Sequence, residues 1–248
     1  HFNSAYGFDF LYAEKLTPAL VREAVENWPS GEGIGWPSWA FSNHDAPRWI
    51  SRWAPEGARD EFARMAMLLF LCLRGNAIIW QGEELGLSQV DIPFEKLQDP
   101  EAIANWPLTL SRDGTRTPMP WSAREENCGF SAHEPWLPFG PDHASHAVDQ
   151  QAGTAGSMLE ETKRFIALRQ SNEALRSGDI RILDANGSVL AFERKSKCQT
   201  LLCIFNLGSE NIEWPSQQPA NWRKVESLNQ AADWTIGAYG ALVLEKIG

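Results

Sequence analysis

Hydrophobic and polar positions in the first half of the chain alternate between helical spacing and short apolar runs. The pair Thr17-Pro18 is a typical helix start, because a hydroxyl caps the first turn and proline suits the first helical position; this helix should end near Trp28. Apolar residues at helical spacing over 57–74 predict a second helix. Short apolar runs typical of buried parallel strands lie at 38–42 and 77–80. The alternation of helices and short apolar strands along the chain indicates parallel βα units.

The second half of the chain changes its pattern twice. Residues 81–157 show no regular period and carry most of the prolines, and an irregular stretch of this length is usually functional, so we expect it to form a wall of the active site. Helical spacing returns over 159–170. Short alternating runs then predict a small antiparallel β domain, with strands at 180–183, 189–194, 201–205 and 240–244. We place the two parts at 1–176 and 177–248.

Charge and hydropathy exclude some classes of partner. The net charge of −10 argues against binding to nucleic acid or to an anionic membrane surface, because phosphate groups require a basic face. The longest apolar run, 65–73, is far shorter than the ~20 residues that span a bilayer. The start at His1 shows no signal or transit peptide, so we expect a processed product or a piece of a longer chain. We expect a cytoplasmic location, and a periplasmic one stays open.

Cysteine and histidine are sparse, and the cysteines lack the spacing of a metal site. We expect free thiols rather than a disulfide framework at the four cysteines, Cys72, Cys128, Cys198 and Cys203. The spacing His143-x-x-His146 is a weak suggestion of metal binding, and solvated loop histidines explain it better. We therefore expect no cofactor and no metal.

One segment places chemically capable residues directly after a predicted parallel strand. Asn43, His44, Asp45 and Arg48 follow Phe41 and Ser42, and in (β/α) barrels the active site lies at the carboxyl ends of the strands. A His-Asp pair at this position can hydrogen-bond a polar ligand. A turn in which Asp45 caps the next helix or pairs with Arg48 explains the pattern equally well.

The segment Phe41-Ser-Asn-His-Asp-Ala-Pro-Arg48 resembles the fourth signature region of the α-amylase superfamily, glycoside hydrolase family 13. Further segments resemble that family in the same order along the chain. They are Gln81-Gly-Glu-Glu-Leu-Gly86 at the end of the eighth barrel strand, Arg112-Asp-Gly-Thr-Arg-Thr-Pro-Met-Pro-Trp121 of the α-glucosidase and oligo-1,6-glucosidase branch, and 165–176 of the last barrel helix.

The resemblance covers nearly the whole chain and implies its fold class. It implies the C-terminal part of a (β/α)8 TIM barrel, with strands six to eight at 2–10, 38–43 and 77–81, followed by a small all-β antiparallel sandwich, domain C. The barrel's first five strands would then come from a missing N-terminal segment of the same protein, which is the macromolecular partner we expect.

The resemblance also implies a retaining hydrolysis of α-glucosidic bonds, in which an Asp nucleophile and a Glu acid/base flank the bond. Asp45 matches the family's third carboxylate, which grips hydroxyls of the distorted sugar in the transition state. His44 would bind the same ring, and Arg116 would help to close the pocket around the terminal glucose. Arg48 and Arg52 match pattern positions of the family, although ion pairing beneath the site explains them equally well.

The nucleophile and acid/base segments of the family have no counterpart in this sequence, and Glu83 and Glu84 lie in the wrong motif to serve as the acid. We interpret these two glutamates as structural residues or as residues that support the site from outside it. The whole enzyme is expected to act on an oligosaccharide or a small α-glucoside, whereas this fragment alone should be inactive.

Four other functions stay open. A sucrose isomerase or a trehalose-forming transglucosylase of the same family would differ mainly in loops on the leaving-group side. A non-catalytic glycosidase-like ectodomain of an amino-acid transporter would have little reason to keep Asn43, His44, Asp45 and Arg116 together. A carbohydrate-binding module would leave the βα units unexplained.

Overall fold

The computed structural model describes residues 3–28, 35–214, 221–232 and 234–247. Its first sheet has three parallel strands in chain order, β1 (Ser4–Gly7), β2 (Trp36–Trp39) and β3 (Asn76–Ala77). The connections between them carry the helices α1 (Pro18–Asn27), α2 (Trp49–Trp53) and α3 (Arg59–Cys72). The predicted parallel βα units are therefore confirmed, except that Phe2 of the first predicted strand lies outside the described residues.

Local sequence signals determine where the first helix begins. The Thr17 side chain accepts a hydrogen bond from the backbone N–H of Leu20 at 3.1 Å, and Pro18 occupies the first helical position. The cap satisfies one of the amides that a helix start leaves without an intrahelical partner. The predicted start is confirmed because it depends on neighbouring residues alone.

The parallel strands are shorter than the apolar runs predict. β2 ends at Trp39 and β3 at Ala77, although Ala40, Phe41 and Ser42 are all buried. Beyond the ladder, the amide of Ile78 still donates to the carbonyl of Trp39 at 2.9 Å. The apolar residues that follow β2 are buried by side-chain packing rather than by strand pairing, and an apolar run alone does not distinguish these two causes.

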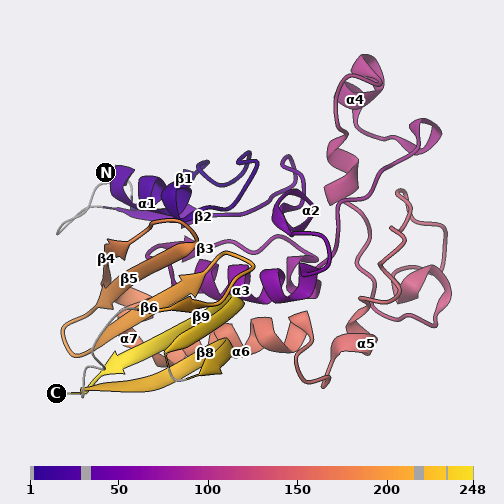
Figure 1. The fold of residues 1–248 in the computed structure, drawn as a ribbon. Helices are drawn as coiled ribbons and strands as arrows, with labels where there is room; N and C mark the ends of the chain where they lie inside the picture. Colours follow the sequence, from indigo (N-terminus) through magenta and orange to yellow (C-terminus); the bar gives the residue numbers. More distant parts are fainter. Residues whose placement is uncertain (1–2, 29–34, 215–220, 233, 248) are drawn as a thin grey trace.

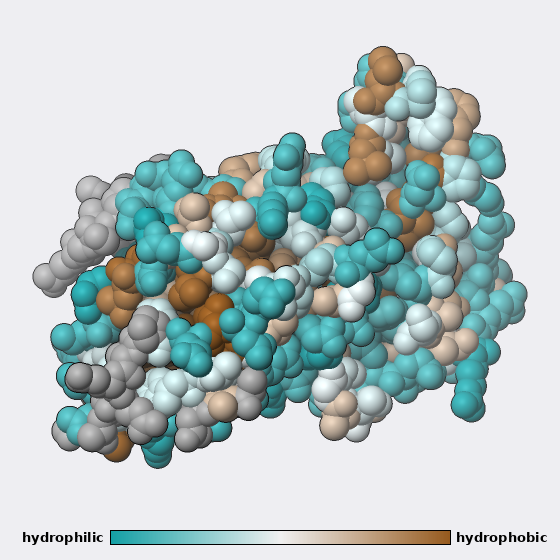
Figure 2. All heavy atoms as spheres, viewed as in Figure 1, coloured by the Kyte–Doolittle hydropathy of each residue, from teal (hydrophilic) through white to brown (hydrophobic). Residues whose placement is uncertain are grey.

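Residues 81–157 are largely irregular, as predicted, and contain α4 (Pro100–Asn105), α5 (Val148–Gln151) and short 3-10 turns. Part of this stretch, residues 91–111, forms an arm that carries α4 and projects from the rest of the molecule (Figure 1). Apolar atoms gather on the arm in Figure 2, where the exposed apolar residues are Phe94, Ile103, Trp106, Leu108 and Leu110.

The predicted helix at 159–170 is α6 (Met158–Ser171), and α7 (Glu173–Ser177) follows it. The β domain is confirmed: its described residues form six antiparallel strands in one hydrogen-bonded sheet, with β4 to β6, β9 and β7 in that order and β8 pairing with β9. Two of its strands, β7 and β8, were not predicted from the sequence. The strands are β4 (Asp179–Asp184), β5 (Val189–Lys195), β6 (Thr200–Asn206), β7 (Ile212–Glu213), β8 (Trp222–Ala232) and β9 (Thr235–Lys246).

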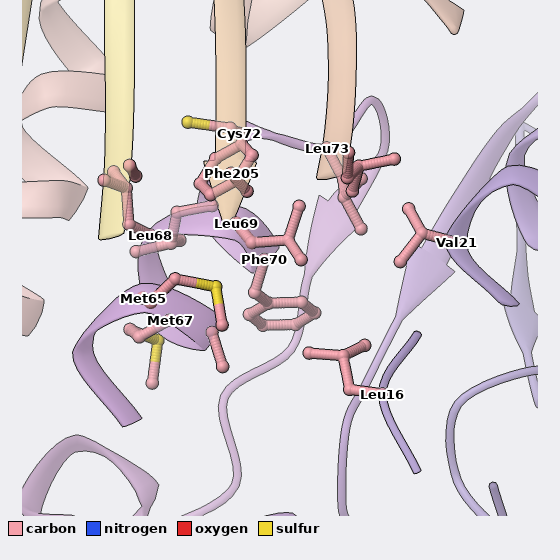
Figure 3. Close-up of a cluster of buried hydrophobic side chains, with 14 of the residues drawn as sticks. Leu16, Val21, Met65, Met67, Leu68, Leu69, Phe70, Cys72, Leu73 and Phe205 are labelled. Carbon is pink, nitrogen blue, oxygen red and sulfur yellow. The ribbon is translucent and has the colours of Figure 1, made fainter. Parts of the chain in front are cut away.

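The largest core cluster joins the two sheets through α3. This helix presents Met65, Leu68 and Leu69 among buried neighbours that include Phe205 of β6 (Figure 3). Burying one large aliphatic side chain stabilises a fold by about 1.5–3 kcal/mol, so this shared helix holds the β domain against the βα units. None of the helices in the described part of the chain combines the length and apolar character that crossing a membrane requires.

Candidate active site

Asp45, His44 and Arg116 meet beyond the carboxyl ends of the parallel strands. Asp45 Oδ1 lies 3.0 Å from Arg116 Nη2, and Asp45 Oδ2 lies 3.2 Å from His44 Nε2. The Asp45 side chain keeps 40% of its surface exposed and that of His44 60%, so both can reach a ligand. The three residues predicted as a site are thus in direct contact, although Arg116 is 71 positions away from Asp45 in the chain.

A local turn orients Asp45. The side-chain oxygen of Asn43 accepts hydrogen bonds from the backbone amides of Asp45 and Ala46, both at 2.8 Å. Asparagine commonly makes this turn because its side chain imitates a backbone carbonyl. The amide group of Asn43 also donates to the hydroxyl of Tyr6 at 3.3 Å, which ties the turn to β1. The next helix, α2, begins after Arg48 and has no side-chain cap, so Asp45 does not cap it, and its half-exposed carboxylate is accessible to a ligand.

Arg116 reaches the site from the irregular stretch. Its Nε donates to the backbone carbonyl of His44 at 2.7 Å, while its Nη2 contacts Asp45. The hydroxyl of Thr115 donates to the carbonyl of Asn43 at 3.3 Å, so two successive residues hold the two segments together. The indole of Trp80 lies against His44, with 6.0 Å between ring centroids.

A second arginine of the same loop contacts Asp45. Arg112 Nη1 lies 3.5 Å from Asp45 Oδ1, the oxygen that also faces Arg116. The other end of the Arg112 guanidinium binds Asp99, which accepts from Nε at 2.9 Å and from Nη2 at 2.5 Å. This hydrogen bonding lowers the pKa of the Asp99 carboxyl well below its ordinary value. The sequence analysis quoted Arg112 within a motif but did not include it in the site.

The two arginines that follow Asp45 do not form the ion pairs that the sequence left open. Arg48 is fully buried and donates to the carbonyls of Gln81 at 2.8 Å and Thr115 at 3.2 Å. Arg52 donates to main-chain carbonyls that include Phe41. Within the described ranges neither guanidinium lies within ion-pair distance of a carboxylate. Burial lowers the pKa of each to about 10.

Arg48 acts instead as a cross-link below the site. Its hydrogen bonds link Gln81, in the turn after β3, to Thr115 in the loop that carries Arg116. The guanidinium also packs against Gly82. Gly82 has a φ of 88°, and a Cβ at this position would lie 2.8 Å from the Arg48 guanidinium. Only glycine adopts this backbone conformation readily and leaves room for the cation.

Glu83 is buried, as a structural residue should be, and holds the turn after β3. Its Oε2 accepts a hydrogen bond from the backbone amide of Trp80 at 2.8 Å. Burial raises the pKa of Glu83 to about 7, although hydrogen bonds from Ser42 and Trp80 partly oppose this shift. Burial also raises the pKa of Glu84, whose carboxylate accepts from the amide of Gly82 at 2.7 Å.

The expectation of solvated loop histidines is wrong for His143. This residue has no exposed surface and packs edge-on against Phe139, with 5.7 Å between ring centroids. His146 is half-buried and contacts Arg59 at 3.0 Å, whereas His133 is exposed. Polar neighbours in the sequence suggested solvent exposure, but the loop folds over His143 and excludes water from it.

The sequence of this chain matches the family model described as alpha amylase, catalytic domain, over residues 7–178. It is 42% identical over 207 residues to a probable alpha-glucosidase of Rhizobium meliloti, a match that covers 83% of this chain and 37% of that protein. It is 30% identical over 229 residues to an oligo-1,6-glucosidase of Bacillus cereus, covering 84% of this chain and 41% of that one.

The fold matches a crystal structure of the alpha-glucosyl transfer enzyme XgtA with a TM-score of 0.87 and 35% sequence identity. That match covers 97% of this chain and 46% of the other. The chain therefore spans about two fifths of the length of the curated relatives and just under half of the solved structure.

Proposed function

The chain belongs to the α-amylase family of glycoside hydrolases, and from this premise we propose that it is the C-terminal part of a retaining α-glucosidase. Residues 1–176 are then the end of the catalytic barrel, and residues 177–248 form the β domain that follows it. The substrate is a short oligosaccharide or small α-glucoside from which terminal glucose is released. The two curated relatives described above are named as glucosidases, which supports this choice.

One observation carries the proposal: the carboxylate of Asp45 is held between Arg116 and His44 at the strand ends where barrel enzymes place their active sites. Its half-exposed oxygens can accept hydrogen bonds from two neighbouring sugar hydroxyls. These bonds strengthen as the ring flattens toward an oxocarbenium-like transition state, so the contact lowers the barrier rather than only binding the substrate. His44 contributes a ring nitrogen to the same sugar.

Arg116 closes the non-reducing end of this pocket. Its guanidinium contacts Asp45 and the carbonyl of His44, which leaves the cation at the edge of the site where a terminal glucose would end. A closed pocket at this end admits a chain terminus and excludes a chain interior. The arrangement therefore supports removal of single terminal residues.

The nucleophile and the acid/base of the family lie outside this chain in our proposal. Retaining glycosidases place these two carboxyl groups ~5–5.5 Å apart across the bond that breaks, and Glu83 is buried in the turn after β3 rather than exposed at the site. The missing pair belongs to the segment that supplies the other barrel strands. We expect no turnover from residues 1–248 alone.

The test is hydrolysis of p-nitrophenyl α-D-glucopyranoside by the full-length protein and its Asp45→Asn variant. We expect kcat/KM to fall at least about 100-fold in the variant, because a neutral amide accepts these hydrogen bonds less strongly than a carboxylate. Asp60→Asn is the matched control, since Asp60 is an exposed carboxylate on α3 whose salt bridge to Arg59 is solvent-screened. Equal turnover in all three proteins would overturn the assignment of Asp45.

Glucosyl transfer is a second candidate activity, favoured by the likeness to a solved alpha-glucosyl transfer enzyme. In a transferase, an acceptor hydroxyl replaces water in the second step of the same double displacement. We expect an added alcohol such as glycerol to raise the release of p-nitrophenol above that of free glucose. Equal amounts of both products at every glycerol concentration would indicate hydrolysis alone.

A further inference from the structure

We propose that a pocket between α1 and β4 binds an oxyanion, either free phosphate or a phosphate monoester, and that Arg74 is the residue that holds it. The pocket lies at the amino ends of the parallel strands, because Arg74 precedes β3 and its guanidinium lies over the ring of Trp36, the first residue of β2. Asp45 follows β2 at the other end of the strands. The pocket is therefore separate from the candidate active site, and the proposal does not depend on the function proposed above.

The pocket has the size of a ligand site and a wall of mixed character. Its volume is about 530 Å³, within the ~300–1,000 Å³ that small-molecule pockets occupy. Val25, Ile180 and Ile182 form an apolar part of the wall, and Glu26 and Arg181 place opposite charges on it. The two elements that supply most of the wall, α1 and β4, lie at the end of the molecule away from the arm (Figure 1). The space can hold a phosphate group together with an organic substituent.

Arg74 is a buried cation that lacks hydrogen-bond partners. Its side chain keeps 8% of its surface exposed, and among the described residues its guanidinium donates no hydrogen bond, the buried Nε included. The carboxylate paired with it belongs to Asp179, whose Oδ1 lies 3.6 Å from Nε and whose side chain is 83% exposed. A buried charge without close partners destabilises a fold, and a guanidinium matches the oxygens of a phosphate in a planar fork. Arg74 therefore has donors that the described chain leaves free for a ligand.

Two further arginines add positive charge behind the pocket. Arg169 and Arg194 donate to main-chain carbonyls near the ends of α3 and α7. Burial lowers the pKa of Arg194 to about 10, and the charges of Arg169 and Arg74 lower it further, so the three cations lie within electrostatic reach of one another. Glu26 and Asp179 are both exposed, and solvent screens their charges. The inner side of the pocket should therefore attract an anion.

An oxyanion on Arg74 would join the two parts of the chain. Arg74 lies between α3 and β3, whereas Asp179 is the first residue of β4 in the β domain. The ligand's oxygens would replace the exposed Asp179 carboxylate as the partner of the guanidinium. Because the pocket exists only while α1, β4 and the segment of Arg74 are together, the ligand should stabilise the folded protein by mass action.

The test is isothermal titration of the full-length protein with inorganic phosphate, at an ionic strength held constant with NaCl. We expect one phosphate per chain. Arg74→Gln should weaken binding at least about tenfold, because a neutral amide cannot replace a charge-assisted pair. Arg124→Gln is the matched control, since it removes an exposed arginine from the irregular stretch and should leave the affinity unchanged. Equal affinities in the wild type and Arg74→Gln would overturn the proposal.

A second variant keeps the test decisive if Arg74→Gln fails to fold. Asp179→Asn removes the competing carboxylate at an exposed position, so it should keep the fold and bind phosphate about threefold more tightly, as expected when a weak surface ion pair no longer competes. A purely structural pair between Arg74 and Asp179 predicts a lower Tm and no gain in affinity. An unchanged or weaker affinity in this variant would therefore overturn the role of Arg74.

Phenyl phosphate distinguishes the two sources of the oxyanion. A monoester whose organic group rests on the apolar wall should bind at least about threefold more tightly than inorganic phosphate. Equal affinities for the two anions would support a site for free phosphate. Failure of the full-length wild type to bind either anion would show that another segment of the protein fills the pocket, and the proposal would be wrong.

Discussion

The carboxylate of Glu83, which is buried in the turn after β3, accepts a hydrogen bond from the backbone amide of Trp80 at 2.8 Å. Through this bond a residue that does not touch the candidate site supports one that does, because the indole of Trp80 lies against His44. The other oxygen of Glu83 has no hydrogen-bond partner in the described part of the chain. Burial disfavours the charged form of a carboxyl that has one unsatisfied oxygen, so such a group is more stable in its protonated, neutral form.

Glu83 should therefore make stability depend on pH in an unusual direction. Its folded-state pKa of about 7 lies above the ordinary 4.5, so the folded protein binds this proton more tightly than the unfolded chain does. The contribution of the group is complete below pH 4.5 and is lost as pH rises to about 7. Relative to Glu83→Gln, the wild type should lose about 3 kcal/mol of unfolding free energy across this interval.

Urea unfolding midpoints between pH 4 and pH 8 measure this difference. Glu56→Gln is the control, because Glu56 is exposed near the start of α3 and its replacement should shift the midpoint equally at every pH. A Glu83→Gln variant whose midpoint runs parallel to that of the wild type would show that folding does not raise the pKa of Glu83.

His143 should make stability depend on pH in the opposite direction to Glu83, over an overlapping pH interval. Burial lowers its pKa to about 4, so the unfolded chain binds the proton first as pH falls below the ordinary 6.5. The contribution of His143 to the free energy of unfolding is complete above pH 6.5. It decreases by about 3 kcal/mol as pH falls toward 4. The wild type should therefore lose stability relative to His143→Gln in acid, whereas His133→Gln, at an exposed position, should not change the slope. Parallel curves for all three proteins would contradict the burial of a neutral imidazole.

Local signals explain which parts of the fold were predictable. The Thr17 cap, the helical spacing of α3 and the alternation of β5 and β6 depend on residues close together in the chain, and each element is present. β8 was not predicted because its sequence is largely polar, so only its pairing with β9 identifies it as a strand. Such pairing is a long-range contact that no short window of sequence contains.

The candidate site was partly predictable for the same reason. Asn43, His44 and Asp45 are neighbours in one loop, and the motif that contains Arg116 pointed to the same pocket. Nothing near Arg112 in the sequence indicates its contact with Asp99, because the two residues are brought together by the fold of the arm. Likewise, the polar neighbours of His143 gave no sign that Phe139 covers it.

The four cysteines should differ sharply in reactivity. All are free thiols; Cys198 is exposed in the turn between β5 and β6, whereas Cys72 and Cys203 are buried. Burial and the neighbouring Cys72 raise the pKa of the Cys203 thiol well above its ordinary value, so it forms little thiolate. Iodoacetamide labelling of the native protein, mapped by mass spectrometry, should modify Cys198 first. Modification of Cys203 at a comparable rate would show that the β domain opens in solution.

Arg194 on β5 provides the last expected effect on stability. It has no exposed surface, and its guanidinium donates to the carbonyls of Cys72 at 2.5 Å, Leu175 at 3.0 Å and Gly178 at 2.9 Å. These carbonyls end α3 and α7, where a helix favours a cation. Burial lowers the pKa of Arg194 to about 10, which still leaves it charged at neutral pH.

Replacing this cation by an apolar side chain of similar length leaves three buried carbonyls without their donor. An unsatisfied buried polar group costs ~1–3 kcal/mol, and removal of a costly buried charge offsets part of that loss, so Arg194→Met should destabilise the fold by about 3 kcal/mol. Arg181→Met on β4 is the control, since its exposed pair with Glu193 contributes ~1 kcal/mol or less. Calorimetry should give a clearly lower Tm for Arg194→Met alone. Equal Tm values for the two variants would mean that water replaces the guanidinium at the helix ends, and the junction would then depend on the apolar contacts of α3.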